Sequence, residues 1–168
     1  MNEQGLREIY REAFGNDGEF EDRLFSLCGE YCRTVSCGDK AAAMLFALPC
    51  EISIPGKSFY AYYLYAAATQ KAYRKKGYMS GLINDLIKEG NPIFLKPANE
   101  GLFSFYERLG FKKFSAVVSA GSPKTARPLD GFARLSSNEA EHGNYSYTAM
   151  SIGMPMDPNG LCFPYIME

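Results

Sequence analysis

A short basic segment in the middle of the chain, Arg74-Lys75-Lys76-Gly77, has the residue types of an anion-binding site. An apolar, aromatic run precedes it and an amphipathic run follows it, which predicts a loop between a strand and a helix. The start of a helix exposes backbone N–H groups that have no intrahelical partner, and the helix dipole adds positive potential there. Because Gly77 has no Cβ, its backbone can approach a ligand closely. With three cations beside it, this loop is predicted to bind a phosphate or pyrophosphate.

The composition is typical of a soluble globular protein. The chain has 168 residues, with 46% hydrophobic and 22% charged residues, which suits one domain with a full core. Its net charge of −1 gives no general indication of nucleic-acid binding. Residues 1–15 lack the apolar core of a signal peptide, and no run reaches the ~18 apolar residues of a membrane span. We therefore predict a cytoplasmic protein that binds neither nucleic acid nor membrane.

Three of the five cysteines, Cys28, Cys32 and Cys37, lie close together in the sequence. The spacing lacks the paired cysteine motifs of zinc sites, and His142 is the single histidine. We therefore predict reduced core cysteines and no metal site.

The elements that must position the basic loop are two helices and three strands before it, and a helix, a strand, a helix and a strand after it. Helices are predicted over residues 2–14 and from Asp17 to Gly29, then strands over 31–36, 41–51 and 59–68. After the loop, the pattern predicts a helix over 79–88, a strand over 93–95, a helix over 100–109 and a strand over 111–120.

The last third of the chain has a weaker pattern. Residues 121–144 are polar and rich in Gly, Ser and Pro, which predicts a long loop with at most short strand pieces. Residues 145–168 are expected to form a final strand and an apolar tail. This strand pairs either within the chain or with a second copy in a homodimer.

Two segments together resemble the signature motifs of the GNAT superfamily of N-acetyltransferases. The first, Tyr73-Arg74-Lys75-Lys76-Gly77-Tyr78-Met79, is similar to the family's pyrophosphate loop, Arg/Gln-x-x-Gly-x-Gly/Ala. The second starts at Asn99 and ends in Phe105-Tyr106-Glu107-Arg108-Leu109-Gly110-Phe111, similar to the family's Phe-Tyr-x-(Lys/Arg)-x-Gly-Phe helix. The resemblance covers residues 31–118. One position departs from it, since Met79 stands where the family usually has a small Gly or Ala.

This resemblance implies an α/β (α+β) fold: one GNAT-like domain over residues 1–168, with a mixed, mostly antiparallel twisted sheet flanked by helices. It also implies that acetyl-CoA donates its acetyl group to a primary amine of a small molecule or peptide, by direct attack in a ternary complex. Backbone groups of residues 67–69 would pair with the pantetheine arm, and N–H groups of residues 75–80 would hold the pyrophosphate. The residues thereby expected to bind acetyl-CoA are Ala67, Ala68, Thr69, Arg74, Lys75, Lys76, Gly77, Tyr78, Met79, Ser80 and Asn99. Asn99 is also a plausible N-cap of its helix.

Tyr106 matches the family tyrosine beside the thioester sulfur. A phenol with a pKa near ~10 can protonate the departing thiolate of CoA; the alternative is a core aromatic under the sheet. The base that deprotonates the amine is not identified, although Glu51, at a strand end, and the Glu168 terminus are candidates.

The acceptor is left open. Alternation along the third strand places Tyr63 and Tyr65 on one face and Tyr60 and Tyr62 on the other, and one pair either lines the acceptor cleft or packs in the core. Acidic residues of the leading helices either attract a cationic amine, such as a polyamine, an aminoglycoside or a lysine, or form solvated helix faces. They are Glu3, Glu8, Glu12, Asp17, Glu19, Glu21 and Asp22.

Two other functions remain alternatives. A module that binds acyl-CoA without catalysis fits Met79 and the missing base. A nucleotide-phosphate binder fits less well, because the loop lacks the Gly-Lys-Ser/Thr ending of a P-loop and a two-glycine dinucleotide fingerprint.

Overall fold

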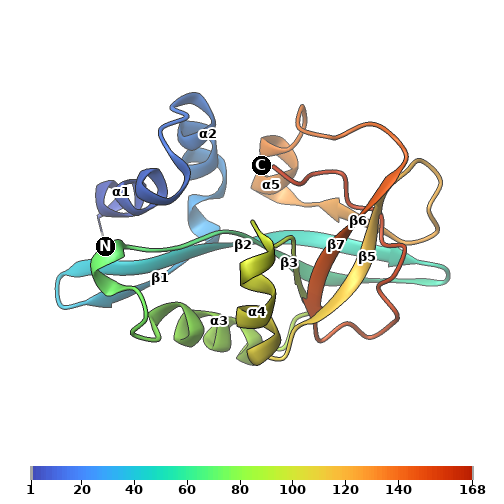
Figure 1. Ribbon diagram of the computed structural model, residues 1–168. Helices are drawn as coiled ribbons and strands as arrows, with labels where there is room; N and C mark the ends of the chain where they lie inside the picture. Colours follow the sequence, from blue (N-terminus) through green and yellow to red (C-terminus); the bar gives the residue numbers. More distant parts are fainter. Residues whose placement is uncertain (1, 168) are drawn as a thin grey trace.

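The computed structural model of the chain describes residues 2–167 and shows a mixed β-sheet with helices on both faces (Figure 1). The strands are β1 (Cys32–Cys37), β2 (Lys40–Ile54), β3 (Lys57–Thr69), β4 (Ile93–Leu95), β5 (Lys112–Val118), β6 (Thr125–Pro128) and β7 (Tyr145–Ile152). The α-helices are α1 (Glu3–Phe14), α2 (Glu19–Cys28), α3 (Tyr78–Lys88), α4 (Phe103–Arg108) and α5 (Asp130–Leu135). Short 3-10 helices cover Gly29–Tyr31, Lys71–Tyr73 and Glu100–Leu102.

The strand order is β1-β2-β3-β4-β7-β5, and β6 pairs with β2 beyond the end of β1. Among the described strands, β3 and β4 run parallel and all other paired neighbours run antiparallel. The predicted mixed, mostly antiparallel sheet flanked by helices is therefore confirmed. β2 and β3 form a long hairpin whose turn contains Gly56, with a φ of 85° that favours glycine.

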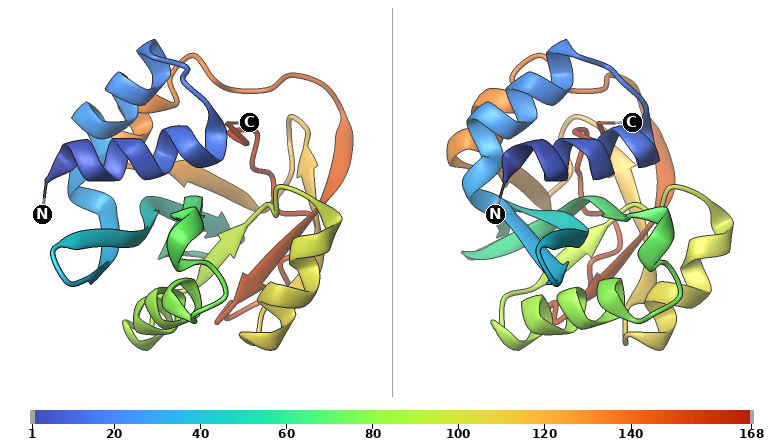
Figure 2. Two further views of the ribbon diagram at one scale, coloured as in Figure 1. Left: turned by 60° about the vertical axis from the view of Figure 1, so that its left-hand side comes forward. Right: turned by 90° about the vertical axis from the view of Figure 1, so that its left-hand side faces the viewer.

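The two faces of the sheet bury separate apolar clusters. Helices α1, α2 and α5 cover one face, and α3 and α4 cover the other, as all three ribbon views show (Figures 1 and 2). Tyr63 belongs to the cluster under α1 and α2, with Tyr65 packed against it, whereas Tyr62 belongs to the cluster under α3 and α4. The predicted alternation of the tyrosines along β3 is thus confirmed, and it follows from the two-residue period of a strand.

A buried carboxylate joins α1 to α2. The side chain of Glu21 is 0% exposed, and its Oε1 lies 3.0 Å from Nη1 of Arg7 and 2.8 Å from Nη2 of Arg11. The N-cap residue of α2 is Gly18 and not the predicted Asp17. Asp17 instead accepts a hydrogen bond from the Glu21 N–H at 3.0 Å and another from the Tyr10 hydroxyl at 3.0 Å. These contacts compensate the buried charge and fix the turn between the two helices over the sheet.

Two predictions about the later elements need correction. Residues 121–144 contain the helix α5 as well as the strand β6, so they are not simply a long loop. The predicted helix over 100–109 is divided into a 3-10 turn, Glu100–Leu102, and the short α4. Helix α5 has only six residues and no side-chain cap, so its sequence carries little of the periodicity that marks a helix.

The last strand and the tail are placed within the chain. β7 pairs with β4 on one edge and β5 on the other, so this strand does not extend a sheet into a second copy. Cys162 then bridges β5 and β6 at Val117 and Thr125.

Three tyrosine hydroxyls tie the end of the tail to the sheet. The Tyr147 hydroxyl donates to the carbonyl oxygen of Phe163 at 2.8 Å. The hydroxyls of Tyr63 and Tyr65 donate to the carbonyl oxygens of Ile166 and Met167, at 3.2 and 2.9 Å. The tail is therefore fixed against the face of β3 that α1 and α2 cover.

Candidate active site

β3 separates from its parallel neighbour β4 at a bulge. Phe46 of β2 pairs with Tyr65, but Met44 pairs with Ala68, so β3 contains one extra residue between these pairs. Ala66 takes up this residue in the left-handed region, with a φ of 51°. The ladder between β3 and β4 ends at the pair Tyr63–Phe94. Beyond it, the edge of β3 that contains Ala67, Ala68 and Thr69 is open on the β4 side.

The basic loop lies at the end of this open edge. Lys75 and Gly77 both adopt left-handed backbone conformations, with φ values of 61° and 83°, and α3 begins at Tyr78. The hydrogen bond from the Gly81 N–H to the Gly77 carbonyl is 2.9 Å long. The N–H groups of Tyr78, Met79 and Ser80 precede this bond in the first turn, where the helix offers no acceptor. The loop therefore presents a row of backbone donors beside the positive end of α3.

The basic side chains of the loop have different environments. Arg74 turns back toward the sheet, with Nε 3.0 Å from the Thr69 carbonyl oxygen and Nη2 3.9 Å from Glu12. Glu12 also accepts the Lys71 N–H at 2.6 Å, which links the loop to α1. Lys76 lies over the ring of Tyr73, with Nζ 5.6 Å from its centre, and Lys75 is exposed. Arg74 therefore stabilises the loop through its contacts with Thr69 and Glu12, while the ammonium groups of Lys75 and Lys76 remain at the surface.

The side chain of Met79 packs toward the sheet. It is half-buried and packs against the apolar cluster under α3 and α4. The apolar cluster under α3 and α4 thus accommodates the larger side chain of Met79, at a position where the motif usually has Gly or Ala.

A cavity of about 940 Å³ passes between the diverging strands β3 and β4. On one side it is lined by Leu95, Leu102 and Tyr106, which belong to or pack against the cluster under α3 and α4. On the other side it is lined by the first two helices and by the tail residues Ile166 and Met167. The cavity therefore extends to both faces of the sheet and is large enough for two bound groups.

Tyr106 lies in the wall of this cavity. It is 6% exposed and packs against the rings of Phe105 and Phe111, with ring centres 5.1 and 5.6 Å away. Burial raises the pKa of Tyr106 to about 12, so its hydroxyl is protonated at neutral pH. Tyr106 is therefore a core aromatic that also borders the cavity.

The remaining predicted residues are only partly gathered at the cavity. Ala67 lines it, whereas Ala68 and Thr69 continue the open edge of β3 toward the basic loop. Asn99 is exposed at the N-cap position of the turn Glu100–Leu102, but its side chain makes no capping hydrogen bond. It follows Ala98, which does line the cavity.

Glu51 is not placed to act as a base at this cavity. It lies near the turn of the β2–β3 hairpin, opposite Tyr60, and its Oε1 is 2.9 Å from Nη2 of Arg127. It is not among the residues that line the cavity. Glu168, the other candidate base, lies outside the described residues.

Several lining residues were missed from the sequence, namely Arg23, Lys96, Glu139, Ile166 and Met167. They come from α2, the end of β4, the segment after α5 and the tail. No motif marks them, because they meet only when distant segments fold together. The apolar tail was the one available signal, since an apolar run near a chain end must be covered by other parts of the protein.

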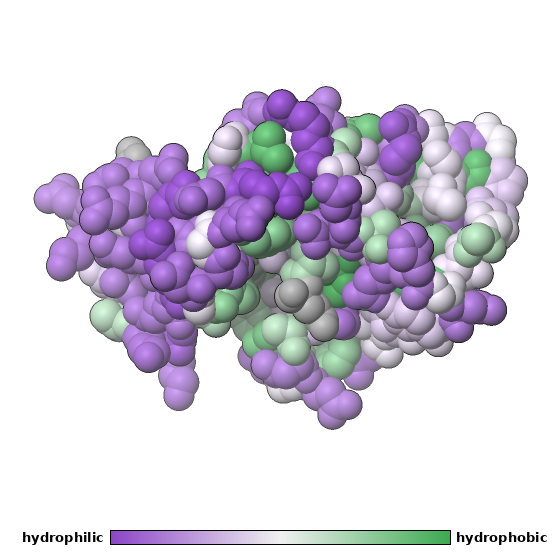
Figure 3. Space-filling view, turned by 90° about the horizontal axis from the view of Figure 1, so that it is seen from above, coloured by the Kyte–Doolittle hydropathy of each residue, from purple (hydrophilic) through white to green (hydrophobic). Residues whose placement is uncertain are grey.

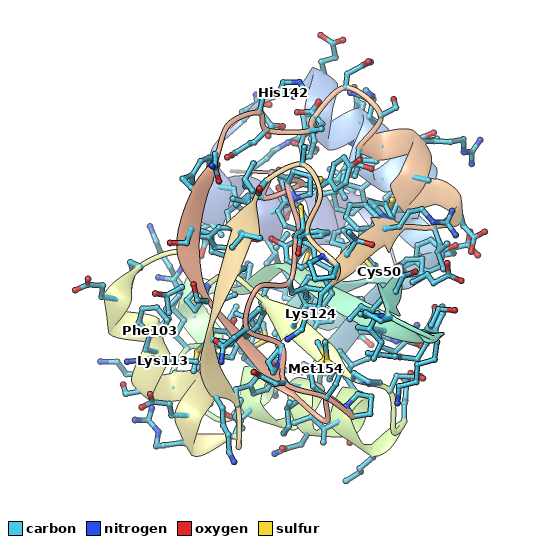
Figure 4. All side chains as sticks on the ribbon, turned by 90° about the vertical axis from the view of Figure 1, so that its right-hand side faces the viewer. Cys50, Phe103, Lys113, Lys124, His142 and Met154 are labelled. Carbon is cyan, nitrogen blue, oxygen red and sulfur yellow. The ribbon has the colours of Figure 1, made fainter. Side chains whose placement is uncertain are left out.

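Residues 2–167 show no group of three or more His, Cys, Asp and Glu side chains suited to a metal ion. All five cysteines are free, and burial raises the pKa of Cys28 and of Cys32 to about 12, which keeps both thiols protonated. Figure 4 shows His142 on the segment before β7, away from the labelled Phe103 and Lys113 at the opposite end of the view. None of the helices within this range is both long and apolar enough to cross a bilayer.

Solved structures of N-acetyltransferases share this fold. A GCN5-related N-acetyltransferase from Anabaena variabilis is 22% identical, with a TM-score of 0.57, over 69% of this chain and 31% of that one. The Bacillus subtilis N-acetyltransferase YlbP in complex with coenzyme A is 15% identical, with a TM-score of 0.53, over 94% of both chains. An aminoglycoside 6'-N-acetyltransferase complexed with coenzyme A is 15% identical, with a TM-score of 0.56, over 91% of both chains.

The comparison with protein-family models also identifies an acetyltransferase. Residues 2–114 match the acetyltransferase (GNAT) domain, and this match covers more than half of the chain. The chain therefore belongs to the GNAT acetyltransferase family. A search of curated protein sequences finds no significant match. The chain spans about a third of the length of the Anabaena protein and of two further similar chains.

Proposed function

We propose that this protein transfers the acetyl group of acetyl-CoA to a primary amine, which attacks the thioester directly while both substrates are bound. The observation that carries this proposal is the cavity between β3 and β4. It is lined by the protonated Tyr106 and by Ala67, from which the open edge of β3 continues toward the N-terminus of α3, and its walls include residues from both faces of the sheet. Two substrates can therefore approach each other from opposite sides.

Backbone groups hold the donor in this proposal. The open edge of β3 at Ala67, Ala68 and Thr69 pairs with the amides of the pantetheine arm, as an added strand would. The N–H groups from Lys75 to Ser80 bind the pyrophosphate, and the ammonium groups of Lys75 and Lys76 add positive charge nearby. Asn99 contacts the arm from the opposite wall.

Two groups act on the reacting atoms. The backbone N–H of Ala67, beside the bulge, donates to the thioester carbonyl oxygen and stabilises the negative charge that develops there. The hydroxyl of Tyr106 donates its proton to the sulfur as the bond between carbonyl carbon and sulfur breaks. The attacking nitrogen releases one proton to solvent, and solvent returns one proton to the Tyr106 oxygen, so the products are the acetylated amine and the free thiol of CoA.

The proposal is tested by isothermal titration of the protein with acetyl-CoA, CoA and ATP. Both CoA forms are expected to bind, and ATP much more weakly, because only the CoA forms carry a pantetheine arm for the open edge of β3. Thiol release is then measured across a panel of amines.

Each outcome has a clear meaning. CoA binding followed by amine-dependent thiol release supports the acetyltransferase. Binding without release for any amine would favour a module that retains the acyl-CoA site but lacks catalysis. Absence of binding by either CoA form would overturn the proposal at its first step.

Gly77 provides a specific test of the phosphate-binding loop. Alanine at Gly77 strains the left-handed backbone, with its φ of 83°, and places a Cβ beside the expected phosphates, so we expect the Kd for CoA to rise about tenfold. Gly90, after the other end of α3, has a similar φ of 86°, and neither glycine has an atom within 4 Å of an added Cβ. Gly90→Ala is therefore a matched control that should lower the melting temperature similarly without changing the Kd. An equal Kd for both variants would exclude the Gly77 loop from CoA binding.

A further inference from the structure

We propose that the acceptor carries a second positive charge besides its reacting amine, and that Asp17 and Glu19 bind this charge at the α1–α2 end of the cavity. The inference rests on the proposed acetyl transfer and specifies its substrate class. A diamine or polyamine has this chemistry.

The two carboxylates differ from most acidic residues around them. Asp17 and Glu19 line the cavity from the turn between α1 and α2. Asp17 accepts only neutral donors, the Tyr10 hydroxyl and the Glu21 N–H, and Glu19 has no ion pair or hydrogen bond within the described part of the chain. The acidic residues of α1 and α2 that do have an arginine partner are Glu3, Glu12, Glu21 and Asp22.

The basic residues of the cavity wall do not cancel this charge. Arg23 donates to the Leu135 carbonyl at 2.9 Å and lies 3.5 Å from Glu139, so it is directed to that carboxylate. Lys96 lies over the Tyr147 ring of β7, with Nζ 5.9 Å from the ring centre. The α1–α2 end of the cavity therefore has an excess of negative charge.

Aromatic rings surround the same end. Phe14 is 45% exposed, and its ring centre lies 5.1 Å from that of Tyr10. Phe20 packs edge-on against Tyr65 at 6.4 Å. Seen from above, a hollow with hydrophobic side chains lies beside the hydrophilic surface of the leading helices (Figure 3). Aromatic faces beside carboxylates favour an alkylammonium ion, because the ring quadrupole attracts the cation and the rings pack against its methylenes.

The reacting nitrogen itself is a poor partner for these carboxylates. It must be uncharged to attack, and a carboxylate beside it would raise its pKa and retain its proton. Tyr106 belongs to the cluster under α3 and α4, whereas Asp17 and Glu19 approach from the helices on the other face. The carboxylates thus suit a cation that does not react and is separated from the attacking nitrogen by a short chain.

The test compares putrescine with butylamine, which has the same carbon chain but one amine. Rates of thiol release are measured at low ionic strength for the wild type, Glu19→Gln and Glu8→Gln. Glu19 is the better site for substitution than Asp17, whose carboxylate also accepts the Glu21 N–H in the first turn of α2. Glu8 is an exposed carboxylate of α1 outside the cavity, and so provides the matched control.

We expect kcat/KM for putrescine to exceed that for butylamine about fivefold, and Glu19→Gln to remove most of this difference by raising KM for putrescine. The butylamine values, the KM for acetyl-CoA and all Glu8→Gln values should stay unchanged. Added salt should lower kcat/KM for putrescine but not for butylamine. Equal kcat/KM for the two amines, or an equal effect of Glu19→Gln on both, would overturn this inference alone. Failure to acetylate either amine or any other in the panel would overturn the proposed function and this inference with it.

Discussion

Replacement of Tyr106 by phenylalanine is expected to lower kcat about 100-fold while the Kd for acetyl-CoA changes less than about twofold. The substitution removes the hydroxyl from the cavity wall but retains the ring, which packs between Phe105 and Phe111. Without that proton donor, the thiolate of CoA must leave unprotonated or take its proton from water. Steady-state kinetics with a saturating amine, and titration calorimetry for the Kd, measure the two effects separately.

The pH dependence of the wild type provides an independent check. Burial raises the pKa of Tyr106 to about 12, so the donor form is present below that pH and is lost only above it. We therefore expect kcat not to decline near the ordinary phenol pKa of about 10. A decline of kcat centred near pH 10 that disappears in Tyr106→Phe would show that the hydroxyl is more solvated than its position indicates.

Tyr62→Phe is the matched control for this prediction. Tyr62 lies in the same apolar cluster and is similarly buried, but its hydroxyl donates to Glu89 at 3.1 Å and does not line the cavity. Its loss should lower stability slightly and leave kcat within about twofold, because a partly exposed hydrogen bond contributes little. Unchanged turnover in Tyr106→Phe, or equal loss in both variants, would remove Tyr106 from the mechanism.

Alanine at Gly131 is expected to lower the free energy of unfolding by about 3 kcal/mol, the largest stability effect predicted for this chain. Gly131 is buried in the first turn of α5, where the backbones of α5 and α2 meet. A Cβ at this position would lie 1.9 Å from the carbonyl oxygen of Leu27 and 2.9 Å from its carbonyl carbon. Both atoms are backbone, so relief requires α5 to move away from α2. Urea denaturation followed by circular dichroism measures the loss.

Gly5→Ala in α1 gives the opposite expected result. An added Cβ there has no atom within 4 Å, and Gly5 lies in a helix, where alanine is favoured by up to about 1 kcal/mol. The pair therefore separates a clash from the general effect of removing a glycine. If Gly131→Ala were as stable as the wild type, the close packing of α5 on α2 would be wrong.

Gly131 also shows why α5 was not recognised from the sequence. The helix has six residues, its cap position is Leu129, and a buried glycine stands where a helix former would be expected. Gly131 packs closely against Leu27, which is far away in the sequence, and this tertiary contact outweighs the low helix propensity of glycine. Glu51 has the same type of explanation. Its position at a strand end suggested a base, but the register of β2 with β6 places it beside Arg127.

The sequence by itself determined the local parts of the candidate site. The basic loop, the start of α3, the alternation of tyrosines along β3 and the position of Tyr106 each depend on residues within one or two turns of one another. Helix termini and strand periodicity are local properties, so these predictions did not require the fold.

Only the tertiary structure decided the cavity and its chemistry. The bulge at Ala66 separates β3 from β4, and the walls combine Asp17 with Glu139 and Met167, which both lie more than a hundred residues after it in the chain. The same folding pairs most acidic residues of α1 and α2 with arginines and leaves Asp17 and Glu19 facing the cavity without a cation. Which charges remain unpaired depends on long-range packing, because an ion pair forms only where the fold brings two side chains within a few ångströms.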